Sequence, residues 1–334
     1  MFSVIIPLYN KAPYIGKALR SVAAQTFTDY ELIVVDDGSK DDSASVAERV
    51  IKDCWLSLSK PQPVKLIRQT NAGVSAARNN GVAASSGDYI CFLDADDWWE
   101  PAFLEEMAAL IAEYPDAGIY GTNYTIINET RHKTRVAPVG VPENFEKGYI
   151  DYCQVYAKTL CMPLWTGAVC IPHRVFDTTD GFPKGIRLGE DFILWIRIAL
   201  KHKVAFLNKT LADYNQDVDV ANRGTQHLHN PENHMLWNLG DLEEEEKTNP
   251  DYKQLIDNLR VYGLFNHYIS KKYHEAAKSE LAKVDWNLQP KRWKKLYGKP
   301  LLWLRMRQKF LSWGSKVKQK LLKVGVVKIV YHKT

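Results

Sequence analysis

The pattern of apolar and polar residues along the first 125 positions alternates between two periods. Short apolar runs rich in β-branched residues predict strands at residues 2–7, 31–35, 64–68 and 89–93. Between these runs, apolar residues recur at spacings of three and four, which predicts helices at residues 14–25, 43–52, 74–84 and 101–114. Because strands and helices alternate, the pattern predicts an α/β fold with a doubly wound, mostly parallel sheet.

Beyond residue 125 the pattern is less regular. Prolines and glycines predict a loop over residues 131–147, and an apolar run predicts a buried strand at 166–171. An apolar helix is expected at 192–200. From residue 230 to 285 the pattern is helical and polar, which predicts a C-terminal helical region.

The segment 291–334 has a strongly basic character. It holds 14 of the 44 Lys and Arg residues and no Asp or Glu, whereas the other 290 residues carry 30 basic and 39 acidic residues. Apolar residues at spacings of three and four form one helical stripe in it: Trp303, Met306, Phe310, Trp313, Val317, Leu321 and Val324. Five of these residues are immediately preceded by Lys or Arg.

This basic amphipathic tail predicts a helix that lies in the interface of an anionic membrane, where long basic side chains snorkel toward water. The alternative is a helix packed on the rest of the protein with a solvated basic rim. No nucleic-acid partner is expected, because the rest of the chain is acidic and carries no known nucleic-acid motif.

Composition narrows the class of protein. With 46% hydrophobic and 25% charged residues, the chain is globular rather than disordered or fibrous. No apolar stretch reaches the ~18 residues of a spanning helix and the N-terminus has no basic leader, so neither a membrane span nor a signal peptide is expected. Five cysteines without a C-x-x-C pair fit reduced thiols in a cytoplasmic protein. Neither a nicotinamide-binding nor a P-loop glycine motif is present.

Polar segments directly follow three predicted strands, at residues 9–11, 36–39 and 94–97, and topology brings them to the rim where doubly wound sheets bind ligands. Asp94, Asp96 and Asp97 repel one another unless a cation or hydrogen bonds compensate them. Carboxylate oxygens in an open site suit Mg²⁺ or Mn²⁺. The alternative is a turn and an N-cap for the helix that Pro101 opens.

Three further polar groups suggest ligand binding, each with a structural alternative. A carboxylate of Asp36 or Asp37 suits the N–H of a base or a ribose hydroxyl, although the segment also suits a plain turn. Arg78 lies one turn into a helix whose N-terminus favours anions; the alternative is a solvated arginine. Trp165 suits the apolar face of a sugar, or the core.

Glu190 and Asp191 are expected at the N-terminus of a helix. The helix dipole favours acidic residues there, which is the structural interpretation. In the functional interpretation, Asp191 is a general base that takes a proton from an attacking hydroxyl.

Five of these segments occur in a characteristic order. They are VIIPLYN at 4–10, VVDDGS at 34–39, N-x-G-x-S-x-A-R-N at 71–79, FLDADD at 92–97 and GED at 189–191. Over about residues 1–215, the sequence resembles family 2 glycosyltransferases with the GT-A fold, particularly bacterial enzymes of surface-polysaccharide assembly. The resemblance does not cover the C-terminal helical region or the tail.

The resemblance implies a nucleotide site. It places Pro7 and Tyr9 beside the base, with Asp37 hydrogen-bonded to it. It places Arg78 against the nucleotide or its phosphates. In the Asp-x-Asp motif, Asp94 contacts ribose or metal-bound water and Asp96 ligates the metal.

The resemblance also implies the catalytic residues and exposes one departure. The Glu-Asp motif corresponds to Glu190 and Asp191, with Asp191 as the base. Many members carry a histidine or an aromatic-histidine element downstream, whereas residues 214–217 of this chain read Tyr-Asn-Gln-Asp. The identity of a third protein ligand to the metal is therefore open.

The sequence as a whole predicts an inverting glycosyltransferase that uses Mg²⁺ or Mn²⁺. Its expected donor is a nucleotide-diphosphate sugar, most simply a UDP-sugar, and its acceptor a hydroxyl of a glycan or lipid-linked molecule in polysaccharide biosynthesis. Residues 1–215 are expected to form the catalytic domain, 216–290 a helical region and 291–334 the tail. The tail would attach a cytoplasmic protein to the inner face of the cytoplasmic membrane.

Two other classes stay open from the sequence. A sugar nucleotidyltransferase also uses an α/β nucleotide domain and paired acids. It usually needs a glycine-rich, basic loop after the first strand, where this chain has Leu-Tyr-Asn-Lys-Ala-Pro at residues 8–13. A non-catalytic protein that binds nucleotide sugars is the other class.

Overall fold

The computed structural model describes residues 1–55, 62–128, 133–218 and 228–310. These residues form two compact units, the first spanning Met1–Ile256 and the second beginning at Asp257. The boundaries expected after residues 215 and 290 separate regions of different expected function, which is another kind of division. They stay a prediction. Of the basic tail, the structure describes residues 291–310, so Trp313, Val317, Leu321 and Val324 lie outside the described residues.

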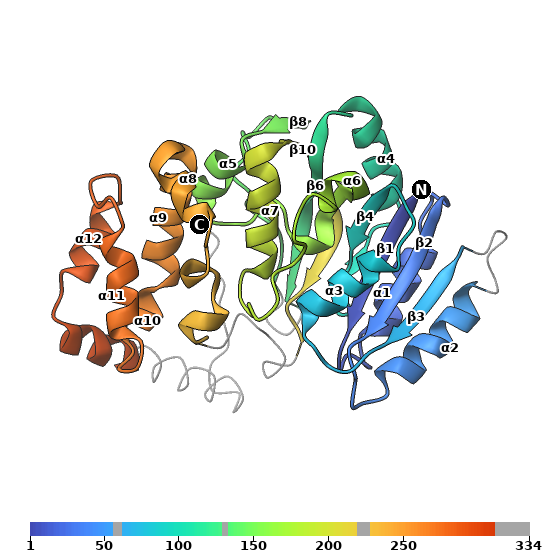
Figure 1. The fold of residues 1–334 in the computed structure, drawn as a ribbon, viewed down its shortest axis with the longest axis horizontal. Helices are drawn as coiled ribbons and strands as arrows, with labels where there is room; N and C mark the ends of the chain where they lie inside the picture. Colours follow the sequence, from blue (N-terminus) through green and yellow to red (C-terminus); the bar gives the residue numbers. More distant parts are fainter. Residues whose placement is uncertain (56–61, 129–132, 219–227, 311–334) are drawn as a thin grey trace, which may run out of the picture. The chain divides into compact units, whose positions relative to one another are not determined.

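The first unit is built on one mixed sheet with the strand order β3-β2-β1-β4-β9-β6-β10-β5 (Figure 1). Strands β1 to β4 are parallel, as are β6 and β10, whereas β9 runs antiparallel between β4 and β6. The strands of this sheet are β1 (Phe2–Leu8), β2 (Tyr30–Asp36), β3 (Val64–Arg68), β4 (Tyr89–Phe92), β5 (Trp98–Trp99), β6 (Ala117–Asn128), β7 (Lys133–Val136), β8 (Lys147–Ile150), β9 (Val169–Pro172) and β10 (Lys203–Asn215). The predicted α/β class with a mostly parallel sheet is confirmed.

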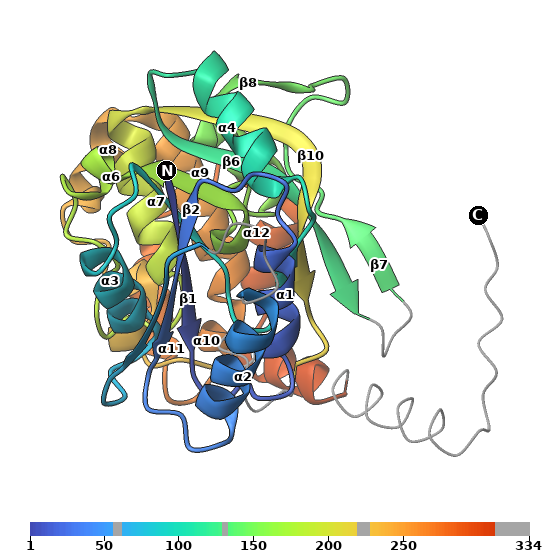
Figure 2. The same cartoon turned by 90° about the vertical axis from the view of Figure 1, so that its right-hand side faces the viewer.

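Helices cover both faces of the parallel strands. Figure 2 shows α3 (Val74–Ala83) on one side of β1 and β2, with α1 (Ile15–Ala23) and α2 (Ser43–Trp55) on the other. All seven residues of β1 are buried, because alternate side chains face the two helical layers. Helix α3 packs so closely that a Cβ on Gly81 would lie 2.4 Å from Ile5 Cγ2.

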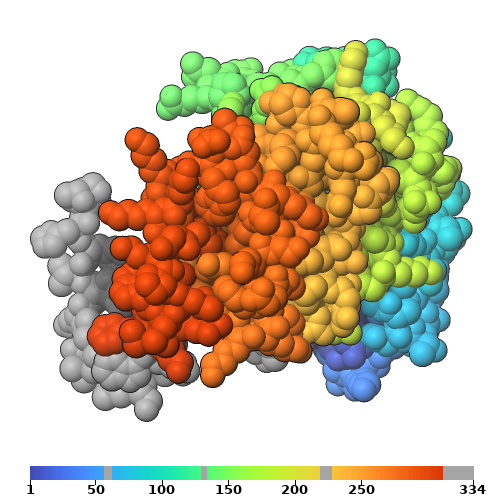
Figure 3. Space-filling model, turned by 60° about the vertical axis from the view of Figure 1, so that its left-hand side comes forward, coloured from blue at the N-terminus to red at the C-terminus, as the bar shows by residue number. Residues whose placement is uncertain are grey.

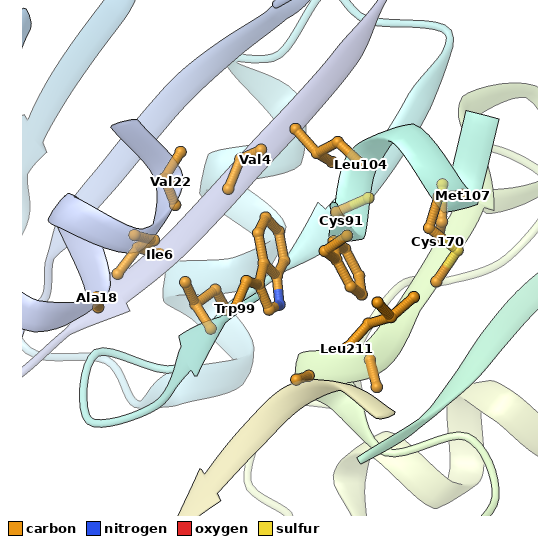
Figure 4. Packing of buried hydrophobic residues seen from close by; sticks show 14 of the residues in the cluster. Val4, Ile6, Ala18, Val22, Cys91, Trp99, Leu104, Met107, Cys170 and Leu211 are labelled. Atoms are coloured by element: carbon orange, nitrogen blue, oxygen red, sulfur yellow. The ribbon is translucent and has the colours of Figure 1, made fainter. Parts of the chain in front are cut away.

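The largest apolar core lies beneath α1 and α4 (Phe103–Glu113). Trp99 stands at its centre and stacks on Phe103 with ring centroids 4.1 Å apart. Figure 4 shows the Trp99 indole between Val4 of β1 and Leu211 of β10, which are far apart in sequence. Trp99, two residues after the acidic motif, is thus fixed in the core.

Two sequence predictions in the middle of the chain need correction. The segment 131–147, predicted as a loop, contains β7 and the first residue of β8, which pair with the edges of β6 and β10. The segment 166–171, predicted as a strand, begins with a 3-10 turn (Thr166–Ala168) before β9. The remaining helices of the first unit are α5 (Tyr152–Thr159), α6 (His173–Phe176), α7 (Glu190–Lys201), α8 (Leu242–Thr248) and the start of α9 (Pro250–Gly263).

The second unit is helical, as the sequence predicts. It contains α10 (Phe265–Ile269), α11 (His274–Ala282), α12 (Lys291–Tyr297) and a further helical segment at 301–310, orange to red in Figure 3. A small apolar core forms around Val261, Leu281 and Val284. None of the helices within the described ranges has the length and apolar character that a bilayer span requires.

Candidate active site

The acidic segment at residues 94–97 follows β4 and turns sharply, because the Asp97 N–H donates to the Asp94 carbonyl at 3.0 Å. The turn separates the roles of its acids. Asp97 is buried and accepts the Asn215 backbone N–H at 2.8 Å, which fixes the end of β10. Burial, with the charges of Asp96 and Asp94, raises the pKa of Asp97 well above its usual range. Asp97 is therefore structural, and Asp94 and Asp96 face the rim.

Asp96 is paired with a cation from the first strand's loop. The Lys11 ammonium lies 2.6 Å from Asp96 Oδ2, and both side chains are less than a fifth exposed. The backbone of Lys11 is held in place, since its N–H donates to Ser43 Oγ at 2.7 Å. Burial raises the pKa of Asp96, and the neighbouring Lys11 ammonium opposes that shift. The structure thus shows that a positive charge is accommodated at Asp96.

The carboxylates of Asp94 and Asp96 suit a hard divalent cation whose other ligands come from a substrate and water. No cluster of three or more Asp, Glu, His or Cys side chains suited to a metal occurs among the described residues. Two carboxylates at an open rim, with Asp94 about one third exposed, are nevertheless typical of Mg²⁺ or Mn²⁺ sites that are completed by phosphate oxygens and water. Asp94 and Asp96 would hold such a cation.

Arg78 connects two motifs that lie far apart in the sequence. Its guanidinium donates to Asp94 Oδ1 at 2.8 Å and to Glu190 Oε1 at 3.1 Å. The side chain is buried, and these two carboxylates raise its pKa despite desolvation. Arg78 therefore ties the end of β4 to the N-terminus of α7. Its assigned contact with a nucleotide or phosphate stays a prediction.

Glu190 is an acid with a perturbed titration. Burial, followed by the charge of Asp191, raises the pKa of Glu190 to about 7, and Arg78 opposes the shift. The preceding Gly189 has φ of 83°, in the left-handed region that glycine adopts without strain. A Cβ there would lie 2.3 Å from Met235 Sδ. Local packing and the backbone thus set where α7 begins.

Asp191 lies beside Glu190 in the first turn of α7, as predicted. Its Oδ1 accepts the Phe192 backbone N–H at 2.8 Å, and its Oδ2 accepts the Thr166 hydroxyl at 2.9 Å. A carboxylate held in this way at a rim can take a proton from a nearby hydroxyl. The role of general base stays a prediction.

The predicted nucleotide side of the site lies at the ends of β1 and β2. Pro7 is buried in β1, and Tyr9, just beyond it, is 39% exposed. Asp37 is buried, and its carboxylate accepts the N–H groups of Ala72 and Gly73 at 2.8 and 2.9 Å. The side-chain amides of residues 69 and 71 donate to the same carboxylate. Asp37 therefore organises the loop before α3, and its contact with a base stays a prediction.

Two residues of this site were missed by sequence reasoning. Lys11 belongs to the same loop as Tyr9, but its partner Asp96 is 85 positions away. Thr166 is 25 positions from Asp191 and sits in a segment interpreted as a strand. The sequence held one indication of the Lys11 contact: three neighbouring acidic residues need a compensating positive charge or hydrogen bonds. It did not indicate that Lys11 supplies that charge.

Comparison with known proteins shows which protein family this chain resembles. Residues 3–165 match the model of Glycosyl transferase family 2. The chain is 34% identical to glycosyltransferase GlyA of Streptococcus pneumoniae over 221 residues, which are 64% of this chain and 30% of that protein. It is 36% identical to putative glycosyltransferase EpsH of Bacillus subtilis over 132 residues, 40% of this chain and 36% of that protein. The chain thus spans about a third of the length of these relatives.

Solved structures support the fold. The S. aureus TarS fragment 1–349, in complex with UDP-GlcNAc, is similar with a TM-score of 0.68 and 20% identity over 86% of this chain and 82% of that one. The mannosyltransferase PcManGT from Pyrobaculum calidifontis, in complex with GDP-Man and Mn²⁺, has a TM-score of 0.56 and 18% identity over 84% and 74% of the two chains. With the ordered motifs, these findings show a glycosyl transferase family 2 domain at residues 3–165 and the GT-A fold.

Proposed function

We propose that this chain is an inverting, metal-dependent glycosyltransferase. It moves a sugar from a nucleotide-diphosphate sugar, with a UDP-sugar as the first choice, to a hydroxyl of a glycan or lipid-linked acceptor in polysaccharide biosynthesis. The observation that carries the proposal is the buried Arg78 bridge, which joins Asp94 of the metal motif to Glu190, the neighbour of the candidate base. The Arg78 bridge holds Asp94, proposed to act on the donor, close to Glu190, the neighbour of the residue proposed to act on the acceptor.

In the proposed reaction, Asp191 takes the proton of the acceptor hydroxyl. The acceptor oxygen forms a bond to the anomeric carbon as the bond from that carbon to the diphosphate oxygen breaks, so an α-linked donor gives a β-linked product. Asp94 and Asp96 would hold a divalent cation, which would neutralise charge on the leaving diphosphate. Glu190 and Arg78 hold the first turn of α7 against the metal motif.

A donor panel tests this function. Purified full-length chain would be incubated with UDP- and GDP-sugars, and slow donor hydrolysis would be measured with no acceptor present. We expect one UDP-sugar to be consumed in Mg²⁺ or Mn²⁺ and to be spared in EDTA. Full turnover in EDTA would contradict the metal role, and release of diphosphate from a nucleoside triphosphate and a sugar phosphate would support a nucleotidyltransferase instead.

Replacing Lys11 with Met is expected to tighten Mn²⁺ binding in the absence of nucleotide by about tenfold. This factor corresponds to about 1.4 kcal/mol of lost competition between the Lys11 ammonium and the metal ion. The ammonium that now occupies Asp96 Oδ2 at 2.6 Å is then lost. Electron paramagnetic resonance of free Mn²⁺ measures the affinity. Lys40→Met is the matched control, because Lys40 is exposed on the next loop. Equal affinities of the Lys11 variant and the wild type would show that the ion pair does not compete with the metal.

We also propose that the segment 291–334 attaches the protein to the inner face of the cytoplasmic membrane. Within its described part, the helical residues 301–310 leave Leu302 70% and Met306 56% exposed, together with Trp303 and Phe310. Residues 291–310 carry eight basic and no acidic residues. Exposed apolar groups among basic ones are typical of a helix in an anionic interface.

The opposite side of residues 301–310 is packed within the second unit. Leu304 is buried, and the Arg305 guanidinium donates to the Ile269 carbonyl at 2.8 Å. Tyr297 also donates to the Val261 carbonyl at 2.8 Å. Deleting everything after Gln289 would therefore remove packed residues, and surface substitutions make the cleaner test.

The double variant Leu302→Ser, Met306→Ser is expected to lower binding to anionic liposomes by at least about tenfold, because burying each such side chain contributes roughly 1.5–3 kcal/mol when complete. Sedimentation with the liposomes measures the bound fraction. Val136→Ser is the control, since Val136 on β7 in the first unit is as exposed as Met306, at 56%. High salt should weaken attachment without abolishing it. Failure of the full-length chain to bind such liposomes would overturn the membrane proposal.

A further inference from the structure

A short turn before β9 contacts the candidate base. The 3-10 turn Thr166–Ala168 is buried, and the Thr166 hydroxyl donates to Asp191 Oδ2 at 2.9 Å. The other oxygen, Oδ1, accepts the Phe192 backbone N–H at 2.8 Å. Each oxygen of the Asp191 carboxylate therefore has a fixed donor, one from its own helix and one from the turn.

The turn is anchored to the segment that follows the metal motif. The Trp99 indole N–H donates to the Gly167 carbonyl at 2.6 Å. Trp99 is itself immobilised in the core, stacked on Phe103 and surrounded by the residues in Figure 4. Because Trp99 lies two residues after Asp97, the turn is tied to the same strand end that presents Asp94 and Asp96.

The turn also depends on a residue without a side chain. The ring of Trp165 folds over Gly167 so closely that a Cβ there would lie 2.5 Å from it. On its other contacts, Trp165 packs against Tyr124 and Tyr214 with ring centroids 4.9 and 5.2 Å apart. The Trp165 carbonyl accepts the Ala168 N–H at 2.8 Å, which closes the turn. Thr166 is thus held from both sides.

We infer that Thr166 is a positioning residue for the transfer reaction. Its hydroxyl holds the Asp191 carboxylate in one orientation, and the Trp99–Gly167 hydrogen bond fixes that orientation relative to Asp94 and Asp96. The inference rests on the proposed function, in which Asp191 is the base. It goes beyond that function, because it names what aims the base: the turn before β9. Small errors in the placement of a catalytic group cost large factors in rate.

Thr166→Val tests the role, since it replaces only the hydroxyl with a methyl group. We expect kcat to fall by about 10- to 100-fold, the scale of a lost hydrogen bond to a charged group, with the donor KM within about twofold of the wild type. Thr166→Ser, which keeps a hydroxyl, should restore most of the rate. Thr166→Ala removes the same hydroxyl without adding volume and serves if the valine variant fails to fold.

The matched control is Thr122→Val on β6. Thr122 is fully buried, and its hydroxyl has no hydrogen-bond partner among the described residues, so the same atoms change at another buried threonine that makes no hydrogen bond to Asp191. This variant should keep kcat within about twofold of the wild type. A comparable fall in kcat for both threonine variants would mean that general packing, rather than the contact with Asp191, explains the loss.

A double-mutant comparison separates this inference from the proposed function. In the Asp191→Asn background, Thr166→Val should cause no further loss of kcat, because there is no base left to position. Loss in Asp191→Asn with wild-type kcat in Thr166→Val would overturn only the role of Thr166. Full turnover in Asp191→Asn would instead contradict the base assignment of the proposed function.

Discussion

Asp191→Asn is expected to lower turnover by roughly 10²–10⁴-fold while donor affinity stays close to that of the wild type. The amide has nearly the same shape as the carboxylate, but it cannot accept the proton of the acceptor hydroxyl. Its oxygen can still accept a hydrogen bond from Thr166 or from the Phe192 backbone, so the start of α7 should be preserved. Transfer rate and binding of the UDP-sugar would be measured side by side.

The control for this prediction is Asp151→Asn. Asp151 is the N-cap of α5, and its carboxylate accepts the Gln154 backbone N–H at 2.8 Å, much as Asp191 accepts that of Phe192. It contacts none of the acids of the site in the described structure, so its variant should transfer sugar at a normal rate. Equal losses of donor affinity and turnover in Asp191→Asn would show that Asp191 supports the structure of the site and is not the base.

The fold was predictable from the sequence where burial follows a local period. The seven residues of β1 are buried on both faces and read as one apolar run, and Ile15, Leu19 and Val22 of α1 form one buried stripe. Strands β7 and β8 were missed, although β7 pairs with the preceding strand β6, because both are short and lie at sheet edges; the partner of β8, β10, is also distant in sequence. An edge strand with exposed residues lacks the apolar run that marks a central one.

The candidate site was predictable as a set of acids but not as a network. The motif order identifies Asp94, Asp96, Glu190 and Asp191, but it does not specify the contacts that join them. Arg78 was assigned to a nucleotide or phosphate, whereas the structure pairs it with Asp94 and Glu190. Ion pairs of this kind join positions 16 and 112 residues apart, and no local pattern specifies them.

Residues that position another side chain are also hard to predict from the sequence. Thr166 is a common residue in an apolar segment, and only the fold shows that its hydroxyl reaches Asp191. The family resemblance placed Asp37 against a base. The structure adds that the loop before α3 already uses both of its oxygens. The role of such a residue depends on its hydrogen-bond partners, and tertiary packing determines which partners it meets.

Asp96→Ala should lower transfer by roughly 10³-fold or more, because the charge stabilisation that a bound cation supplies is worth several kcal/mol. The variant loses a carboxylate ligand and leaves the Lys11 ammonium without its observed partner at 2.6 Å. Both changes act against cation binding, so Mn²⁺ affinity should fall in this variant, whereas it rises in Lys11→Met. Opposite shifts from the two halves of one ion pair would separate a metal ligand from a residue that merely maintains the fold.

Calorimetry of UDP binding with and without Mn²⁺ completes the test of Asp96. The wild type should bind UDP more tightly when Mn²⁺ is present, and Asp96→Ala should lose that gain while it keeps the metal-free affinity. Asp97 is a poor control, because its carboxylate is buried and fixes Asn215. Asp53, exposed on α2 away from the strand ends, is the suitable one. Near-normal turnover in Asp96→Ala would mean that the reaction needs no metal ligand at this position, and that the Lys11–Asp96 pair is part of the fold alone.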